Sequence, residues 1–200
     1  MLGRNSPKPQ GANTMSAVSQ ARATLDDLYH TPGKAELIGG RIVAQMATGR
    51  TPNRVAGRIF RSLDDYSERV SRGEAYTDNM GFAVPELPSG RQSFAPDASY
   101  YDGPLPANLM RFIEGPPKFA AEVRSEGDYE AGAEVEMADK RADYFAAGTE
   151  VVWDVDPIAK RIYAYRASDP NQPNVFRPGQ VADAEPAVPG WRVAVDWVFG

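Results

Sequence analysis

Hydrophobic and polar positions in the first third of the chain predict two helices and a hairpin. Thr24 can cap a short helix over 25–30 that stops before Pro32. In segment 35–46, apolar residues flank a Gly-Gly pair, which is typical of a tight β-hairpin. From 52 to about 70, apolar residues recur at helical spacing and predict a long helix with one buried stripe.

The middle of the chain predicts three strands and a further helix. The strand candidates span about 74–84, 97–101 and 118–124, and the Pro- and Gly-rich stretches between them predict loops. The helix is expected over 134–147, with Gly148 as its C-cap. Strands that alternate with helices in this way are typical of a sheet covered by helices.

The last third of the chain predicts more strands. Apolar runs indicate strands over 150–156 and 161–166, which we expect to form a hairpin. A polar, turn-rich tail over 172–190 then leads to a last alternating strand over 191–199. Together the elements predict an α/β (α+β) fold, a mixed β-sheet flanked by helices with an N-terminal β-hairpin.

The composition fits one folded domain over 21–200. Hydrophobic residues make up 42% of the 200 residues and charged residues 24%, which are ordinary values for a globular protein. Residues 1–20 are rich in Gly, Pro, Ser and Asn and lack the apolar core of a signal peptide, so we expect a disordered leader there. No apolar run approaches the length of about 18 residues that a membrane span needs.

The lack of cysteine and the single histidine narrow the chemistry. A chain without cysteine has neither disulfides nor thiolate metal sites, and it fits a reducing cytoplasm. With His30 as the one histidine, imidazole zinc sites and Ser-His-Asp triads are nearly ruled out. The net charge of -5 argues mildly against a non-specific nucleic-acid coat.

Three polar residues carry the strongest chemical signal. Asp97 opens a predicted strand, Glu122 stands alone among apolar residues, and Lys140 borders the buried stripe of a predicted helix. Two carboxylates can hold Mg²⁺, and a lysine can steady an attacking water or the charge that develops on a phosphate. These are the groups that a metal-dependent phosphodiesterase needs, although a lone Asp97 also fits a solvated strand start.

Glu122 and Lys140 also have structural interpretations. A buried, unpaired carboxylate is costly, so Glu122 needs a cation, a partner or a proton, and Arg124 is one candidate partner. Lys140 fits a surface pair with Glu136 one helical turn earlier. The acids of the Asp-Val-Asp-Pro segment at 154–157 are more simply part of a turn than metal ligands.

Five stretches of the chain have a characteristic order and spacing between about 24 and 199. They are Glu36-Leu-Ile-Gly-Gly-Arg-Ile-Val, Ala95-Pro-Asp-Ala-Ser, Ala121-Glu-Val-Arg-Ser, the helix-to-strand segment 139–156, and Pro189-Gly-Trp-Arg-Val-Ala-Val-Asp-Trp-Val-Phe. In this order they resemble the Uma-two family of bacterial endonucleases, which belongs to the PD-(D/E)XK superfamily. The resemblance implies the restriction endonuclease-like fold, and segment 139–156 is its most specific part.

The resemblance also implies a role for each candidate site residue. Asp97 and Glu122 would ligate Mg²⁺ or Mn²⁺, with the carbonyl of Val123 as a third ligand. Lys140 would position water or stabilise charge. Glu36 corresponds to a further acid of the family, which binds a second metal or orients a water, and its alternative is a polar hairpin residue.

Several positions depart from the family pattern. The superfamily commonly carries its lysine two residues after the glutamate, where this chain has Arg124, whereas the family places it on the following helix. Asn53 stands where the family often has a histidine, and Glu126 adds an acid near the site. Arg124, Glu126 and the acidic net charge favour an alternative function, a catalytically inactive nuclease-fold module that binds nucleic acid or a protein. A phosphohydrolase of small substrates is a third hypothesis.

DNA is the partner that the resemblance implies. Candidate phosphate contacts lie on a stripe of the long helix away from its buried side, although a solvated helix face is the alternative. Nucleases of this fold often cut duplexes as dimers, so analogy suggests a homodimer. The arginines of the stripe are Arg50, Arg54, Arg58 and Arg61.

Overall fold

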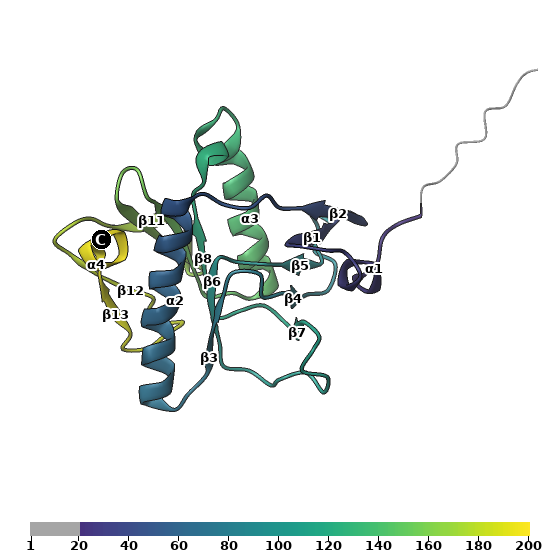
Figure 1. The fold of residues 1–200 in the computed structure, drawn as a ribbon, viewed down its shortest axis with the longest axis horizontal. Coiled ribbons are helices and arrows are strands. Elements are labelled where there is room, and N and C mark those ends of the chain that lie inside the picture. The colour runs from purple at the N-terminus through teal and green to yellow at the C-terminus, as the bar shows by residue number, and fades with distance from the viewer. Residues whose placement is uncertain (1–20) are drawn as a thin grey trace, which may run out of the picture.

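A computed structural model describes residues 21–200, and its centre is a six-stranded β-sheet (Figure 1). From one edge to the other, the strands are β11 (Asp169–Phe176), β10 (Arg161–Arg166), β9 (Val151–Asp156), β8 (Phe119–Val123), β6 (Ala98–Tyr101) and β3 (Glu74–Thr77). The pair β8/β9 is parallel and the other pairs are antiparallel, so the predicted mixed sheet is confirmed. The leader predicted over 1–20 lies outside the described residues.

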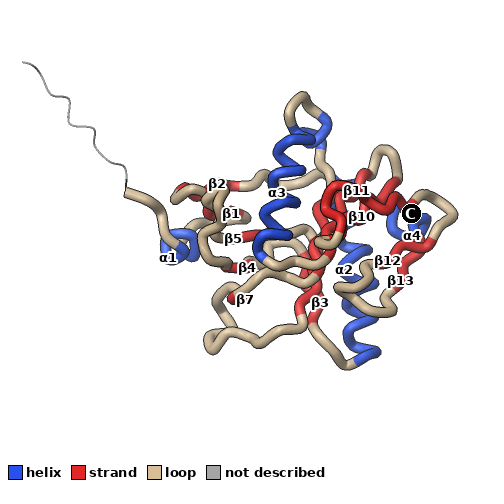
Figure 2. Tube along the Cα trace, turned by 180° about the vertical axis from the view of Figure 1, so that it is seen from behind, coloured by secondary structure: helices blue, strands red, loops and turns tan. Residues whose placement is uncertain are grey.

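Two helices cover opposite faces of this sheet and make it the middle of three layers (Figure 1, Figure 2). Helix α2 (Arg50–Val70) buries its apolar stripe in the core that contains Trp153. Helix α3 (Ala133–Ala147) lies on the other face, where Tyr144 belongs to a second core. Glu122 of β8 faces α3, because its carboxylate is hydrogen-bonded to the Tyr144 hydroxyl.

The predicted N-terminal hairpin is confirmed, and it lies beyond α3 at the right-hand side of Figure 1. Its turn residues Gly39 and Gly40 have φ angles of 59° and 70°, the left-handed conformation that a two-residue hairpin turn requires. The hairpin and the other small elements are α1 (Leu25–Tyr29), β1 (Ala35–Ile38), β2 (Arg41–Ala44), β4 (Phe82–Ala83), β5 (Ser93–Phe94), β7 (Ile113–Glu114), η1 (Glu126–Tyr129), β12 (Val181–Asp183), β13 (Arg192–Ala194) and α4 (Val195–Phe199).

One predicted strand is in fact two. The strand expected over 74–84 divides into β3 and β4, which belong to different sheets. Asn79 between them has a φ angle of 75°, and a left-handed residue turns the chain out of the extended conformation. The predicted loops on either side of β6 also contain the two-residue strands β5 and β7. Within residues 21–200, no helix is both long enough and apolar enough to cross a bilayer.

The prediction of a polar, turn-rich tail over 172–190 is wrong, because this segment contains β12 and much of β11. The sequence did not predict β11 because the segment contains Pro170 and Pro173, and proline argues against a central strand. β11 is the edge strand of the sheet, where a residue without an N–H is tolerated.

The strand predicted over 191–199 is correct only in its first half. Strand β13 ends at Ala194 and the chain continues as α4. Val195 and Val198 are both fully buried, and this spacing of three residues suits a helical turn better than a strand.

Candidate metal centre

The two predicted metal-binding acids lie on neighbouring strands of the central sheet. Asp97 directly precedes β6, and the next residue, Ala98, lies opposite Ala121 of β8. The backbone amide of Val123 donates a hydrogen bond of 2.8 Å to Asp97 Oδ2. The carboxylate of Asp97 therefore lies against the stretch of backbone that carries Glu122.

Lys140 reaches the same place from α3. Its Nζ lies 2.9 Å from Glu122 Oε1 and 3.1 Å from Glu36 Oε1, so one ammonium joins acids from two different strands. Tyr144, one helical turn later, donates a hydrogen bond of 2.6 Å to the same oxygen of Glu122. The alternative surface pair of Lys140 with Glu136 is wrong.

Glu36 of β1 is almost fully buried, with 2% of its surface exposed. Its Oε1 accepts a hydrogen bond of 3.0 Å from the Ala95 amide in addition to its ion pair with Lys140. Its Oε2 forms an ion pair with Arg91, whose Nε lies 2.8 Å from Asp143 of α3. Both oxygens of Glu36 therefore have protein partners, so this polar residue of the hairpin is buried in the site.

A second lysine, absent from the predicted site, lies on the other side of Asp97. The Nζ of Lys34 lies 2.8 Å from Asp97 Oδ1 and 2.6 Å from Asp78 Oδ1. Lys34 lies in the bend directly before β1, two residues before Glu36. No motif or periodic spacing in the sequence marks Lys34 or Asp78.

Burial and ion pairing act differently on the two glutamates. Burial raises the pKa of Glu122, Lys140 opposes this only in part, and the neighbouring charge of Asp97 adds to it. Burial would also raise the pKa of Glu36, but the charges of Lys140 and Arg91 outweigh it and lower that pKa. Negative charge is therefore less fully compensated at Glu122 than at Glu36.

Eight ionisable side chains form two ion-pair networks, which meet where Asp97 lies against the backbone beside Glu122, and we call them together the site cluster. Its five acids and three bases leave an excess of two negative charges when all are ionised. One divalent cation would balance that excess. The members are Lys34, Glu36, Asp78, Arg91, Asp97, Glu122, Lys140 and Asp143.

A second group of ion pairs, the arginine cluster, lies beside the site cluster. Asp154 of β9 lies opposite Glu122 in the parallel register. Arg124 holds Asp154 through two hydrogen bonds of 2.7 Å, and Arg141 lies 3.0 Å from it. Both arginines also lie 3.0 Å from Glu134, so two acids and two bases give no net charge. The alternative pairing of Glu122 with Arg124 is wrong.

The two acids of segment 154–157 have different partners. Asp156 Oδ1 accepts hydrogen bonds of 2.9 and 2.8 Å from the amides of Ile158 and Ala159, so the predicted turn is confirmed there. Asp154 belongs to the arginine cluster instead, and its sequence context alone gives no sign of these partners.

The residues around Asp97 fit a hard divalent cation. Within residues 21–200, no three His, Cys, Asp or Glu side chains form a metal-binding group. The ligands that the resemblance implies are two carboxylates and one carbonyl. The carbonyl of Val123 points to the same side of β8 as its amide, which binds Asp97. Mg²⁺ accepts such oxygen ligands and usually keeps several waters, so an incomplete protein cage suits it.

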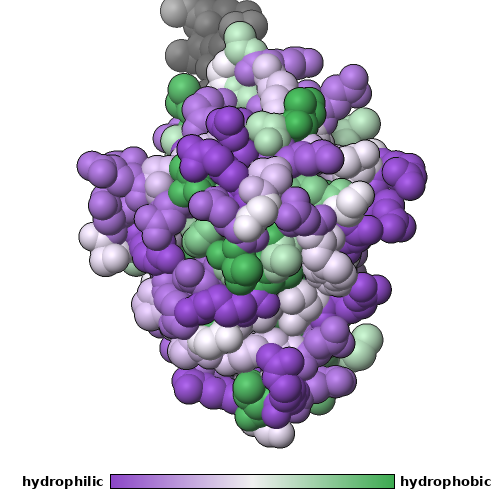
Figure 3. All heavy atoms as spheres, turned by 90° about the vertical axis from the view of Figure 1, so that its left-hand side faces the viewer, coloured by the Kyte–Doolittle hydropathy of each residue, from purple (hydrophilic) through white to green (hydrophobic). Residues whose placement is uncertain are grey.

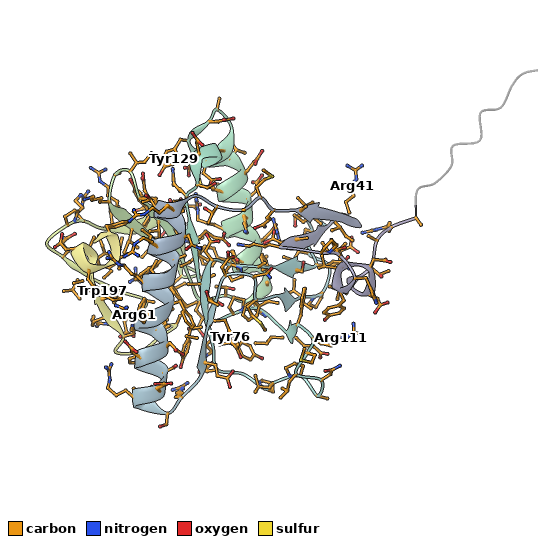
Figure 4. The ribbon with its side chains drawn as sticks, viewed as in Figure 1. Arg41, Arg61, Tyr76, Arg111, Tyr129 and Trp197 are labelled. Atoms are coloured by element: carbon orange, nitrogen blue, oxygen red, sulfur yellow. The ribbon has the colours of Figure 1, made fainter. Side chains whose placement is uncertain are left out.

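The four arginines of the predicted phosphate-binding stripe have different surroundings. The guanidinium of Arg61 lies 4.9 Å from the Trp197 ring, and Arg58 donates a hydrogen bond of 2.9 Å to the Trp197 carbonyl. Arg61 and Trp197 lie together on the flank of α2 that points away from α3 (Figure 4). That flank is largely hydrophilic around an apolar centre (Figure 3). Arg50 and Arg54 are exposed near the start of α2.

Comparison with known proteins agrees with this architecture. The model of the Uma2 family, described as "Putative restriction endonuclease", matches residues 22–196. The fold is similar to the crystal structure of "a putative nuclease belonging to DUF820" from Anabaena variabilis ATCC 29413. The TM-score is 0.68 at 18% identity, and the match covers 88% of this chain and 97% of that one. The predicted restriction endonuclease-like fold is confirmed, and no curated protein matches the sequence.

Proposed function

Because the chain belongs to the Uma2 family, we propose that it is a metal-dependent endonuclease that hydrolyses DNA phosphodiester bonds. The observation that carries this proposal is the pair of carboxylates, Asp97 and Glu122, within a cluster that has an excess of two negative charges. The inferred cofactor is Mg²⁺ or Mn²⁺, and the inferred ligands are these two carboxylates and the Val123 carbonyl.

The chain holds both carboxylates in fixed orientations. The Val123 amide fixes Asp97, and Tyr144 and Lys140 fix Glu122. Ligands that are already ordered lose little conformational entropy when they bind. When bound, the divalent ion would supply Lewis acidity to a phosphodiester oxygen and to the attacking water.

Lys140 contributes a permanent positive charge. Burial would lower the pKa of its ammonium, but the charges of Glu122 and Glu36 outweigh burial and raise the pKa above its ordinary value. Lys140 therefore stays protonated near neutral pH and does not accept a proton. We assign it to the stabilisation of negative charge on the phosphate or to the orientation of water. Glu36 positions Lys140 and is not assigned a metal of its own.

The departure at Arg124 does not count against an active site. Its guanidinium is held by Asp154 through two hydrogen bonds and by Glu134 through a third, in the arginine cluster. Arg124 therefore does not compete with Lys140 for Glu122, and the ion pair between Lys140 and Glu122 is present. This arrangement favours the enzyme over the inactive nuclease-fold module.

Plasmid nicking in the presence of Mg²⁺ or Mn²⁺ tests the proposal. We expect metal-dependent nicking by the wild type and its loss in Asp97→Asn and Lys140→Met. The matched control is Lys118→Met, because Lys118 also lies between two acids, 3.5 Å from Asp102 and 3.2 Å from Glu150, at the opposite end of β8.

The control should nick like the wild type. Equal nicking by all four proteins would identify a contaminating nuclease and contradict the proposal. A wild type that binds DNA without nicking it in either metal would favour the inactive module.

A further inference from the structure

The ammonium of Lys34 lies against Asp97 where a bound cation would lie. It is 2.8 Å from Asp97 Oδ1, while Asp97 Oδ2 accepts the hydrogen bond of the Val123 amide. The Lys34 side chain is only 14% exposed and that of Asp97 20%. Each oxygen of the predicted metal ligand therefore has a protein partner, and one of the two partners is itself a cation.

Asp78 provides the same ammonium with a second acid. Its Oδ1 lies 2.6 Å from the Nζ of Lys34, and its side chain is 37% exposed, more than that of Asp97. Asp78 belongs to the turn between β3 and β4, outside the strands that carry Asp97 and Glu122. The ammonium can therefore give up Asp97 and remain paired with Asp78.

Lys34 differs in this respect from Lys140. The Nζ of Lys140 lies between Glu122 and Glu36, and Glu36 is also held by Arg91 deep in the site. The stem of Lys34 has rotatable bonds, and a lysine ammonium binds as a point charge without a fixed planar geometry. Of the two lysines, Lys34 is therefore the one that can move aside.

We propose that Lys34 competes with the divalent ion for Asp97 and that Asp78 receives its ammonium when the ion binds. The inference rests on the proposed function, because it takes Asp97 as a metal ligand. Lys34 and Asp78 are then positioning residues that set the affinity of the site for its metal. Loss of Lys34 removes both a competing hydrogen bond to a charged group and the repulsion between two cations.

Calorimetric titration of the metal-free, full-length protein with Mn²⁺ measures this competition without any need for activity. Lys34→Met should bind Mn²⁺ about tenfold more tightly than the wild type. Lys34→Gln, which keeps a polar side chain, should change the affinity in the same direction. Asp78→Asn should bind several-fold more weakly, because the ammonium then keeps Asp97 as its one acid.

The double variant Lys34→Met/Asp78→Asn distinguishes movement of the Lys34 ammonium to Asp78 from a simple effect of the Asp78 charge. If Asp78 acted only through its charge, Asp78→Asn would weaken binding equally in the wild type and in Lys34→Met. Competition predicts that most of its effect disappears in Lys34→Met, so the two substitutions are not additive. Lys118→Met, which removes the same charge elsewhere, should leave the Mn²⁺ affinity unchanged.

Asp97→Asn distinguishes failure of this inference from failure of the proposed function. If the wild type binds no Mn²⁺, or binds it equally well after Asp97→Asn, the proposed metal site is wrong. If binding depends on Asp97 but Lys34→Met leaves it unchanged or weakens it, the competition is overturned and the metal site stands.

Discussion

Two clusters of ion pairs lie side by side on the α3 face of the sheet, and consecutive residues of one helix serve them. Lys140 pairs with Glu122 in the site cluster, and Arg141 pairs with Asp154 in the arginine cluster. The two acids lie opposite each other on parallel strands. The clusters therefore lie on the same face of the sheet, and they differ in the sum of their charges.

That difference separates a structural network from a binding site. In the arginine cluster, the planar guanidinium of Arg124 donates two hydrogen bonds to Asp154, and the charges of the two arginines and two acids cancel. In the site cluster, two lysines and Arg91 lie among five acids, and an excess of two negative charges remains. Charge balance thus distinguishes the two clusters better than the number of charged residues does.

The largest expected effect is on stability, in the arginine cluster. Asp154→Asn leaves Arg124 and Arg141 without their buried counter-charge, which should lower the free energy of unfolding by about 3–5 kcal/mol. Asp97→Asn should cost less than about 1 kcal/mol, because Lys34 keeps Asp78. Urea unfolding of the metal-free proteins measures both free energies. A larger loss of stability in Asp97→Asn than in Asp154→Asn would contradict the distinction between the two clusters.

The next largest effect is on nicking activity. Here we expect Asp97→Asn to have a larger effect than Asp154→Asn, the reverse of the order expected for stability. Asp97→Asn should lower the initial rate of plasmid nicking by about 10²-fold or more, because a carboxylate ligand is lost. Asp154→Asn, assayed where it is fully folded, should keep a rate near that of the wild type. A comparable loss in both variants would show that the arginine cluster also takes part in catalysis.

The two glutamates of the site cluster should respond oppositely to pH and to the same substitution. The pKa of Glu36 is lowered, so its stabilisation is present above its usual value of 4.5 and is lost as the pH falls through the folded-state pKa. The pKa of Glu122 is raised, so its contribution is largest below 4.5 and is lost as the pH rises through the folded-state pKa.

Unfolding at pH 7 and at pH 4 therefore distinguishes the two glutamates. At pH 7, Glu36→Gln should lower the free energy of unfolding by about 1–3 kcal/mol, whereas Glu122→Gln should leave it unchanged or raise it. Both differences from the wild type should shrink at pH 4. Destabilisation of similar size by Glu122→Gln at pH 7 would mean that its charge is fully compensated.

The smallest effect concerns the arginines of α2. Arg54→Ala should weaken DNA binding about two- to threefold and reduce the slope of affinity against salt by about one. The control is Arg61→Ala, because Arg61 packs on Trp197 on the flank away from α3. Equal loss of salt dependence in both variants would extend the DNA-binding surface to that flank.

Asp97, Glu122 and Lys140 are selected by their order along the chain and by the family resemblance, and the structure brings them together. These signals could not predict the partners Lys34 and Asp78, which reach the site from the bend before β1 and from the β3–β4 turn. Those approaches depend on tertiary packing and have no periodic signal. The same limit explains β11, whose edge position, set by the sheet, tolerates the prolines that argue against a strand.

The most direct test of the account is the position of Mn²⁺ in a crystal of the wild-type protein, located by anomalous scattering. The account predicts one peak between the carboxylates of Asp97 and Glu122, with the Lys34 ammonium turned to Asp78. It predicts no peak in the arginine cluster. A peak beside Asp154 and Glu134, or a map with none next to Asp97, would contradict the central claim.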